Sequence, residues 1–254
     1  MKITALQFEI KDGAAEENLA TALRLLREAP GADVYLLPEL FTSGYAFSEW
    51  ERIADEHTPR AVAELEHVAR AKSGIIVSGM ISRTASDRLA NRAWAVGGEQ
   101  PITYDKAHLI AAFREPELLE CGASSCLTEI AGAKTHISIC FDLRFPELYR
   151  AAAKAGAEIF LVISEWPSVR GEALRTLARA RAMENQAFVA LCNRTGCAAD
   201  GTGFGGASAI FDPQGVVLAE AGEREAICTA EVNVNAAREL RQTFPVLGLS
   251  RAWE

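Results

Sequence analysis

The sequence has few of the features that mark membrane, secreted or nucleic-acid-binding proteins. Acidic side chains outnumber basic ones, 34 to 26 among 254 residues, and give a net charge of −8 at pH 7. Nucleic acids and anionic membranes attract basic surfaces, so neither is expected as a partner. The longest purely apolar stretches, such as residues 159–163, are far too short to span a bilayer. Glu9, Lys11 and Asp12 interrupt the first apolar segment, so we expect no signal peptide and a cytoplasmic protein.

Metal-ligand spacing is also missing. The six cysteines, at positions 121, 126, 140, 192, 197 and 228, include no CxxC pair, and the two Cys-x4-Cys pairs lie far apart. In an intracellular chain of this size we expect free thiols, with no zinc site and no other cofactor. A papain-like cysteine–histidine site would need one of only four histidines, of which His108, near Lys106, is the best placed.

No linker or charge run divides the chain, so one domain is predicted over residues 1–254. Apolar and β-branched runs predict strands, and amphipathic patterns predict helices between some of them. The predicted strands cover residues 3–10, 33–37, 75–81, 93–96, 102–104, 135–139, 158–163, 187–192, 207–211, 216–219 and 226–232, and the helices 14–29, 59–72, 146–155 and 172–184. This order predicts an α/β fold in which two sheets pack face to face with helices outside.

Three predicted strands are followed closely by a reactive side chain. Glu39 follows the strand near residues 33–37, Lys106 follows 102–104, and Cys140 follows 135–139. Functional groups gather at the carboxyl ends of strands in α/β sheets. We therefore expect these three side chains to form one nucleophilic site.

Their chemistry suggests a role for each. A free thiol has a pKa near ~8.5, so at neutral pH the attacking cysteine needs a base. Glu39 can take that proton as Cys140 attacks, and the Lys106 ammonium can stabilise the developing oxyanion. The backbone N–H of Phe141 can complete the oxyanion hole. Pro146 suits the first position of a helix, which places Cys140 on a strand-to-helix elbow.

The motifs around these residues resemble those of the nitrilase superfamily. They read LLPELF at residues 36–41, YDKAHL at 104–109, ICFDLRFPEL at 139–148, ARARAMENQ at 178–186, NR at 193–194 and DPQG at 212–215. The resemblance spans nearly the whole chain. It implies a four-layer α-β-β-α sandwich of two mixed sheets, a covalent thioester intermediate and no metal.

The same resemblance implies a second glutamate in the active site. The family often carries Glu, and Gly a few residues later, between the lysine and the cysteine. Here FREPELLECG at residues 113–122 matches, and Glu115 is the residue carried over. Glu117 and Glu120 are alternative registers, and the implied role is to orient Lys106 and the substrate nitrogen.

Within the superfamily the chain is most similar to the bacterial omega-amidases. The similarity lies in EWP at 165–167 followed by Arg170, CNR at 192–194 and LRQTFP at 240–245. Two departures flank the substrate pocket: Ala173-Leu174 stands where a His-Trp pair is usual, and Ser164-Glu165 where small or amide residues are usual. The resemblance implies a short dicarboxylate monoamide substrate of the 2-oxoglutaramate or succinamate type.

The residues offer a way to hold such a substrate. An arginine fork binds carboxylates bidentately, and Arg170 lies in the loop after Trp166, which can line the carbon chain. Arg144 and Arg194 are alternative carboxylate partners. A nitrilase or an N-carbamoyl hydrolase would use the same three residues, whereas a non-catalytic homologue or a zinc hydrolase would not. The resemblance also implies a homodimer, and the apolar C-terminal run 244–249, ending near Trp253, favours one.

Overall fold

The first two strands are buried on both faces. In the computed structural model, which describes residues 1–249 and 251, β1 spans Lys2–Gln7 and β2 spans Val34–Leu36. Ile3 and Val34 belong to one hydrophobic cluster, whereas Tyr35 belongs to another. Because successive side chains of a strand point to opposite faces, both faces of this sheet need a cover.

One face is covered by a second sheet. The first sheet has the order β14-β1-β2-β3-β4-β5 and the second the order β13-β12-β9-β8-β7-β6; parallel and antiparallel pairs occur in both. The remaining strands of the first sheet are β3 (Ile75–Arg83), β4 (Leu89–Val96), β5 (Ile102–Asp105) and β14 (Ala226–Glu231). The second sheet comprises β6 (Cys126–Ile130), β7 (Ala133–Ile139), β8 (Ile159–Ser164), β9 (Phe188–Asn193), β12 (Ala209–Phe211) and β13 (Val217–Glu220).

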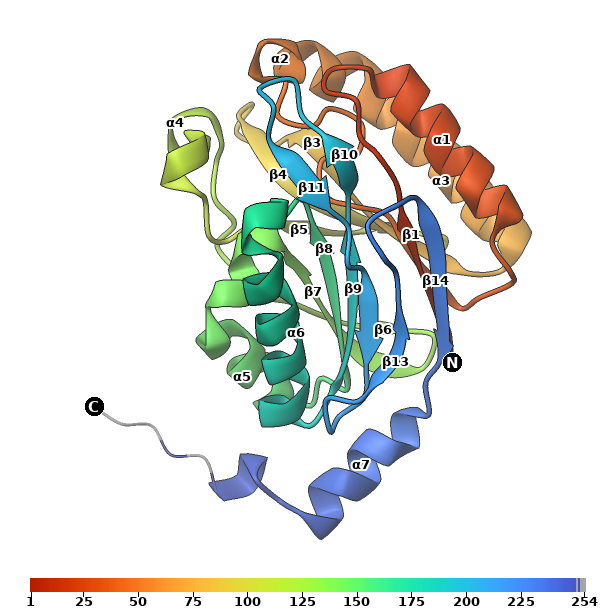
Figure 1. The fold of residues 1–254 in the computed structure, drawn as a ribbon, viewed down its shortest axis with the longest axis vertical. Helices are drawn as coiled ribbons and strands as arrows, with labels where there is room; N and C mark the ends of the chain where they lie inside the picture. Colours follow the sequence, from red (N-terminus) through yellow and green to blue (C-terminus); the bar gives the residue numbers. More distant parts are fainter. Residues whose placement is uncertain (250, 252–254) are drawn as a thin grey trace.

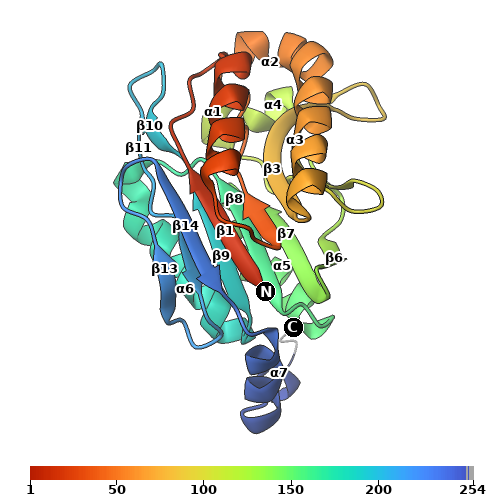
Figure 2. The ribbon, with the colours of Figure 1, turned by 90° about the vertical axis from the view of Figure 1, so that its right-hand side faces the viewer.

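Helices cover the outer faces. Apolar residues of α1 (Ala15–Glu28) and α3 (Thr58–Lys72) pack on the first sheet, and those of α5 (Pro146–Lys154) and α6 (Gly171–Asn185) pack on the second. Figures 1 and 2 show the two helix pairs on opposite sides of the paired sheets. The four-layer α-β-β-α sandwich of two mixed sheets is therefore confirmed.

Several short elements escaped the sequence analysis. They are β6, the small pair β10 (Thr195–Cys197) and β11 (Gly203–Gly205), α2 (Trp50–Arg52) with the π-helical turn Ile53–His57, α4 (Glu115–Leu118), and α7 (Val234–Thr243). β6 is an edge strand whose side chains are mostly half-exposed, so it lacks the apolar run of a central strand. α7 is amphipathic, so its sequence carried a helical pattern that was overlooked, although it buries only Ala237 among its residues.

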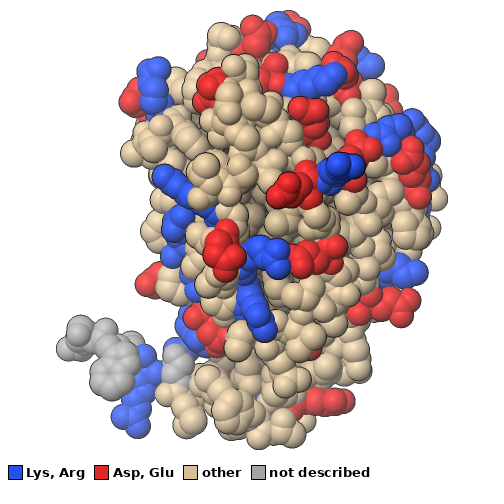
Figure 3. All heavy atoms as spheres, viewed as in Figure 1, with Lys and Arg blue, Asp and Glu red and all other residues tan. Residues whose placement is uncertain are grey.

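The surface carries charged side chains of both signs. The face drawn in Figure 3 mixes acidic and basic side chains, with wide areas of neither kind between them. Across the described residues, no helix combines the length and the apolar character needed to cross a membrane. Trp253, at the end of the apolar tail, lies outside the described residues.

A glycine at the contact between the two sheets keeps space for the segment that carries Glu39. A Cβ atom at Gly79 of β3 would stand 2.7 Å from the Cα of Glu39 and 3.0 Å from the Cδ1 of Ile163 in β8. Both neighbours belong to well-packed elements, so neither can move away freely.

We predict that Gly79→Ala lowers the free energy of unfolding by about 1–3 kcal/mol through overpacking. It should also lower kcat on the order of tenfold, because Glu39 is displaced. Chemical denaturation and steady-state kinetics measure the two effects. Gly98→Ala is the control, since its Cβ would meet nothing closer than 3.8 Å. Unchanged stability and kcat in Gly79→Ala would contradict the prediction.

Candidate active site

The fold brings the three strand-end residues together. Glu39 lies three residues beyond the end of β2, Lys106 directly follows β5, and Cys140 directly follows β7. Glu39 and Lys106 are 0% exposed and Cys140 is 2% exposed, so all three side chains are removed from water. The three side chains thus come together at the carboxyl ends of their strands, as the sequence predicts.

Lys106 lies between two carboxylates. Its Nζ donates to Oε1 of Glu39 and to Oε1 of Glu115, each at 2.8 Å. Burial alone would lower the pKa of this ammonium, but the two carboxylates outweigh burial and raise the pKa above its ordinary value. Lys106 is therefore held in its charged form at neutral pH.

The carboxylate oxygens of Glu39 accept hydrogen bonds from three donors. Oε1 accepts from Asn91 Nδ2 at 2.7 Å as well as from Lys106. Oε2 accepts from the backbone N–H of Glu165 at 2.8 Å. Hydrogen bonds from three separate elements fix the orientation of this carboxylate, as a general base requires.

Glu115 is fixed in the same manner. It opens α4, directly after Arg114, whose φ of 57° is left-handed. Its Oε1 also accepts from Tyr45 Oη at 2.9 Å, and its Oε2 accepts from Ile110 N at 2.7 Å. Of the three glutamates considered in this loop, Glu115 is thus the one that reaches Lys106.

The two alternative registers point elsewhere. Glu117 pairs with Arg114 at 2.9 Å, and its side chain is 61% exposed. Glu120 accepts from the hydroxyls of Thr84 and Ser86.

Cys140 stands on a strained elbow. Its φ is 45°, a left-handed value that non-glycine residues rarely adopt, and it begins the 3₁₀ turn Cys140–Arg144 before α5. Asp142 stabilises the turn by accepting from Ile139 N at 3.0 Å and from Tyr104 Oη at 2.7 Å. The predicted strand-to-helix elbow is present, with a 3₁₀ turn inserted.

His108 is also part of this elbow. Its Nδ1 lies 2.7 Å from Asp142 Oδ1, and its ring stacks on Phe145 with the centroids 3.6 Å apart. These contacts suit a residue that supports the turn. The base best placed for Cys140 is Glu39.

The thiol of Cys140 is protonated at neutral pH. Burial raises its pKa well above the ordinary value, and the Glu39 carboxylate raises it further, while Lys106 opposes both. A thiol in this state is a weak nucleophile until a base removes its proton.

A small cavity opens at Cys140. Its volume is about 220 Å³, and Cys140, Phe141, Glu165, Trp166 and Arg170 are among the residues that line it. Trp166 is fixed by donating from Nε1 to the backbone oxygen of Arg170 at 2.9 Å. The predicted substrate-binding residues Phe141, Trp166 and Arg170 therefore share one cavity with the cysteine.

The two alternative arginines differ. Arg144 lines the same cavity, with its guanidinium 4.9 Å from the Trp166 ring centroid. Arg194 is fully buried, and its Nη1 donates to Glu165 Oε2 at 2.8 Å. Arg194 is thus occupied by an internal contact with Glu165, and Arg144 is the better-placed alternative to Arg170.

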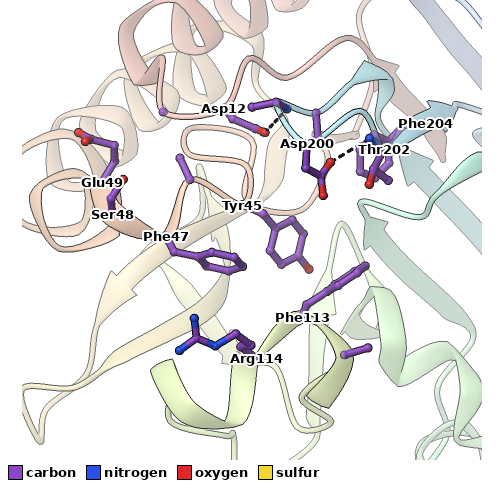
Figure 4. Close-up of a pocket in the computed structure, with 15 residues that line it drawn as sticks. Asp12, Tyr45, Phe47, Ser48, Glu49, Phe113, Arg114, Asp200, Thr202 and Phe204 are labelled. Carbon is purple, nitrogen blue, oxygen red and sulfur yellow. Dashed lines mark hydrogen bonds between the residues drawn. The ribbon is translucent and has the colours of Figure 1, made fainter.

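A larger cavity of about 600 Å³ adjoins the first, and the two share Ala112, Phe113 and Thr202 as walls. Figure 4 shows the rings of Tyr45, Phe47 and Phe113 gathered along one side of it and Asp12 and Asp200 on the other. The hydroxyl of Tyr45 contacts Glu115, so this cavity borders the Lys106 network. Over residues 1–249 and 251, no group of three His, Cys, Asp or Glu side chains is arranged to hold a metal ion.

Comparisons with known proteins identify the family. The family model for carbon-nitrogen hydrolases matches residues 2–242, so the chain belongs to this family. It is 37% identical to a 2-oxoglutaramate amidase from Bacillus subtilis (strain 168), covering 96% of this chain and 95% of the relative. It is 33% identical to the omega-amidase YafV from Escherichia coli (strain K12), covering 96% and 94%.

A solved structure agrees with the sequence relatives. XC1258 from Xanthomonas campestris, described as a CN-hydrolase superfamily protein with an arsenic adduct in the active site, superposes with a TM-score of 0.93. It is 29% identical and covers 100% of this chain, which covers 98% of it. The resemblance to the nitrilase superfamily and its omega-amidase branch is confirmed, and the protein is a carbon-nitrogen hydrolase enzyme.

Sequence reasoning missed several side chains that hold the site together. Asn91 lies inside β4, Tyr45 in a loop, and Asp142 in the turn after Cys140. None follows an apolar strand directly, so the pattern that found Glu39, Lys106 and Cys140 gave no signal for them. Asp142 lies inside the motif at residues 139–148, which was the one available hint.

We predict that Glu39→Gln separates thiol reactivity from turnover. Loss of the negative charge lowers the pKa of Cys140, so the pH of half-maximal iodoacetamide labelling should move to a lower value. Amide turnover should nevertheless fall on the order of 10²-fold or more, because glutamine cannot accept the proton. Peptide mapping by mass spectrometry, with exposed Cys121 and Cys197 as internal controls, measures the labelling. Retained amide turnover in Glu39→Gln, or a pH of half-maximal labelling that moves to a higher value, would contradict the prediction.

Proposed function

We propose that the protein hydrolyses a small carboxylated amide of the 2-oxoglutaramate or succinamate class through a thioester on Cys140. Glu39 takes the thiol proton as Sγ bonds to the amide carbon. Lys106 and the N–H of Phe141 stabilise the oxyanion. Glu39 then passes the proton to the leaving nitrogen, the C–N bond breaks and ammonia departs. Water, deprotonated by Glu39, then attacks the thioester carbon; the C–S bond breaks, the acid is released, and Glu39 returns the proton to Cys140 Sγ.

The observation that carries the proposal is the contact of Lys106 Nζ with both Glu39 and Glu115 beside the cavity of Cys140. In this arrangement Glu39 serves as base, and Glu115 orients the ammonium and the substrate nitrogen. The names of relatives at 33–37% identity support the substrate class.

The acyl part of the substrate is assigned to the small cavity. A volume of about 220 Å³ suits a chain of a few carbons. Trp166 contributes an apolar wall, and the exposed guanidinium of Arg170 is the partner for the far carboxylate, with Arg144 as the alternative.

Nitriles and N-carbamoyl compounds can pass through the same thioester chemistry. An amide releases ammonia alone, whereas a carbamoyl group releases ammonia and carbon dioxide, so product analysis separates these substrates.

We predict that succinamate is hydrolysed with a kcat/KM about 10–100-fold above that of butyramide, the range expected for hydrogen bonds to a charged group. Arg170→Ala should remove most of that preference, and Arg144→Ala tests the alternative partner. Arg175→Ala is the matched control, because Arg175 pairs with Glu220 at 2.7 Å away from this cavity. Cys140→Ala provides the inactive blank in the ammonia assay. Equal rates on both amides would leave only a general small-amide hydrolase.

We also propose a homodimer. Phe244 is 65% exposed and Leu249 is 77% exposed, so both ends of the apolar tail are open, although Leu247 packs partly against the core of its own chain. Its start is nevertheless anchored, since Gln186 Nε2 donates to Phe244 O at 2.8 Å. Light scattering at micromolar concentration should give twice the 27.4 kDa of one chain, and Phe244→Glu should weaken the association. A monomer mass for the unaltered protein would contradict this prediction.

The cytoplasmic location stays a prediction.

A further inference from the structure

A third carboxyl group lies within the active site and has no part in the chemistry described so far. Glu165 directly follows β8, is 0% exposed and lines the cavity of Cys140. Its backbone N–H holds Glu39, and its backbone oxygen lies 3.9 Å from Cys140 Sγ. Its backbone thus contacts both Glu39 and Cys140, and its carboxyl group is buried near the Glu39 carboxylate.

The two oxygens of this carboxyl group differ. Oε2 accepts from Arg194 Nη1 at 2.8 Å, whereas Oε1 is buried and, among the described residues, has no hydrogen-bond partner. A buried polar atom without a partner is costly, and at an active site it suggests a bond that is completed by the ligand.

We propose that Glu165 is a specificity-determining residue, whose Oε1 contacts the substrate and whose carboxyl must be uncharged for an anionic amide to bind well. The inference rests on the carboxylated substrate proposed above. With Oε2 engaged as an acceptor, a proton on Oε1 makes this oxygen a donor toward an acceptor oxygen of the substrate. Once ionised, the same oxygen repels an anion in a cavity of low dielectric.

The surroundings favour the uncharged form up to mildly alkaline pH. Burial raises the pKa of Glu165 to about 8; Arg194 opposes this rise, and Glu39 and Asp12 add to it. Asp12 Oδ1 lies 3.5 Å from Arg194 Nη1, so it shares the guanidinium with Glu165. The other charged or titratable groups around the cavity are Cys140, Arg144 and Arg170 in its lining, and Lys106 and Glu115 beyond Glu39.

The test is the ratio of kcat/KM for succinamate to that for butyramide, measured from about pH 6 to about pH 9.5. Groups that affect the chemistry of both substrates, such as Glu39 and Cys140, cancel in this ratio. In the unaltered protein the ratio should fall by about tenfold or more as pH rises through about 8.

Two variants sharpen the test. In Glu165→Gln the ratio should be independent of pH, because the amide keeps an acceptor for Arg194 and a donor for the substrate but cannot ionise. In Asp12→Asn the fall should move to lower pH, because removing the Asp12 charge favours the ionised Glu165. Circular dichroism checks that both variants fold, and the pH dependence of the unaltered protein supports or rejects the proposal even if they do not.

Each other outcome overturns a particular claim. A preference for succinamate that does not change with pH would reject the role of Glu165 and leave the proposed function intact. The same fall in Glu165→Gln as in the unaltered protein would assign the titration to another group. A ratio near one at every pH would reject the carboxylate preference together with the role of Glu165. No ammonia from either amide would reject the proposed function itself.

Discussion

The contact of the Lys106 ammonium with two carboxylates is the interaction on which the site depends. A buried ion without partners costs several kcal/mol, and removing one partner of a buried pair costs ~3–5 kcal/mol. Glu39 and Glu115 come from different loops, so Lys106 holds the loop after β2 and the segment at α4 in one arrangement. Asn91 and Tyr45 each bind one of these carboxylates, which extends the arrangement to β4 and to a further loop. The need to pair the buried charge of Lys106 thus determines where the side chains of the proposed active site lie.

The thiol is positioned by backbone geometry instead. Residues in the left-handed region cost ~1–3 kcal/mol and persist only where their surroundings hold them. Cys140 has a φ of 45°, and Asp142 holds its turn through bonds to Ile139, Tyr104 and His108. The Lys106 network and this elbow are linked, because Tyr104 and His108, two residues on either side of Lys106, both bind Asp142, and they meet at Cys140. The pKa of the Cys140 thiol is high because the thiol is buried next to the Glu39 carboxylate. The thiol therefore depends on Glu39 to remove its proton.

Sequence patterns could predict the layers and the main reactive groups because both depend on local order. Strands buried on both faces, such as β8 with six buried residues in a row, give apolar runs. Glu39 and Cys140 follow largely buried strands within a few residues, whereas Lys106 follows β5, which is only partly buried. Edge strand β6 was missed because its side chains are mostly half-exposed and give no apolar run, whereas α7 is amphipathic and its helical pattern was overlooked. Asn91 and Tyr45 could not be found, since their roles arise only where distant segments meet. Arg194 was one candidate for the carboxylate, and its burial against Glu165 became evident only in three dimensions.

The buried chain Asp12–Arg194–Glu165 joins the two cavities electrostatically. Arg194 has no exposed surface, so it needs partners within the protein: Asp12 supplies a carboxylate at 3.5 Å, and Glu165 Oε2 accepts a hydrogen bond at 2.8 Å. Asp12 lines the larger cavity, while Glu165 lines the cavity of Cys140. A small residue at position 165 would remove the acceptor that lies 2.8 Å from Arg194 Nη1 and leave Asp12, at 3.5 Å among the described contacts. A glutamate there therefore has a structural reason that is tied to the presence of Arg194. Because Asp12 and Glu165 both contact Arg194, a change of charge at Asp12 alters the pKa of Glu165. The protonation state of the cavity at Cys140 therefore depends on a residue outside that cavity.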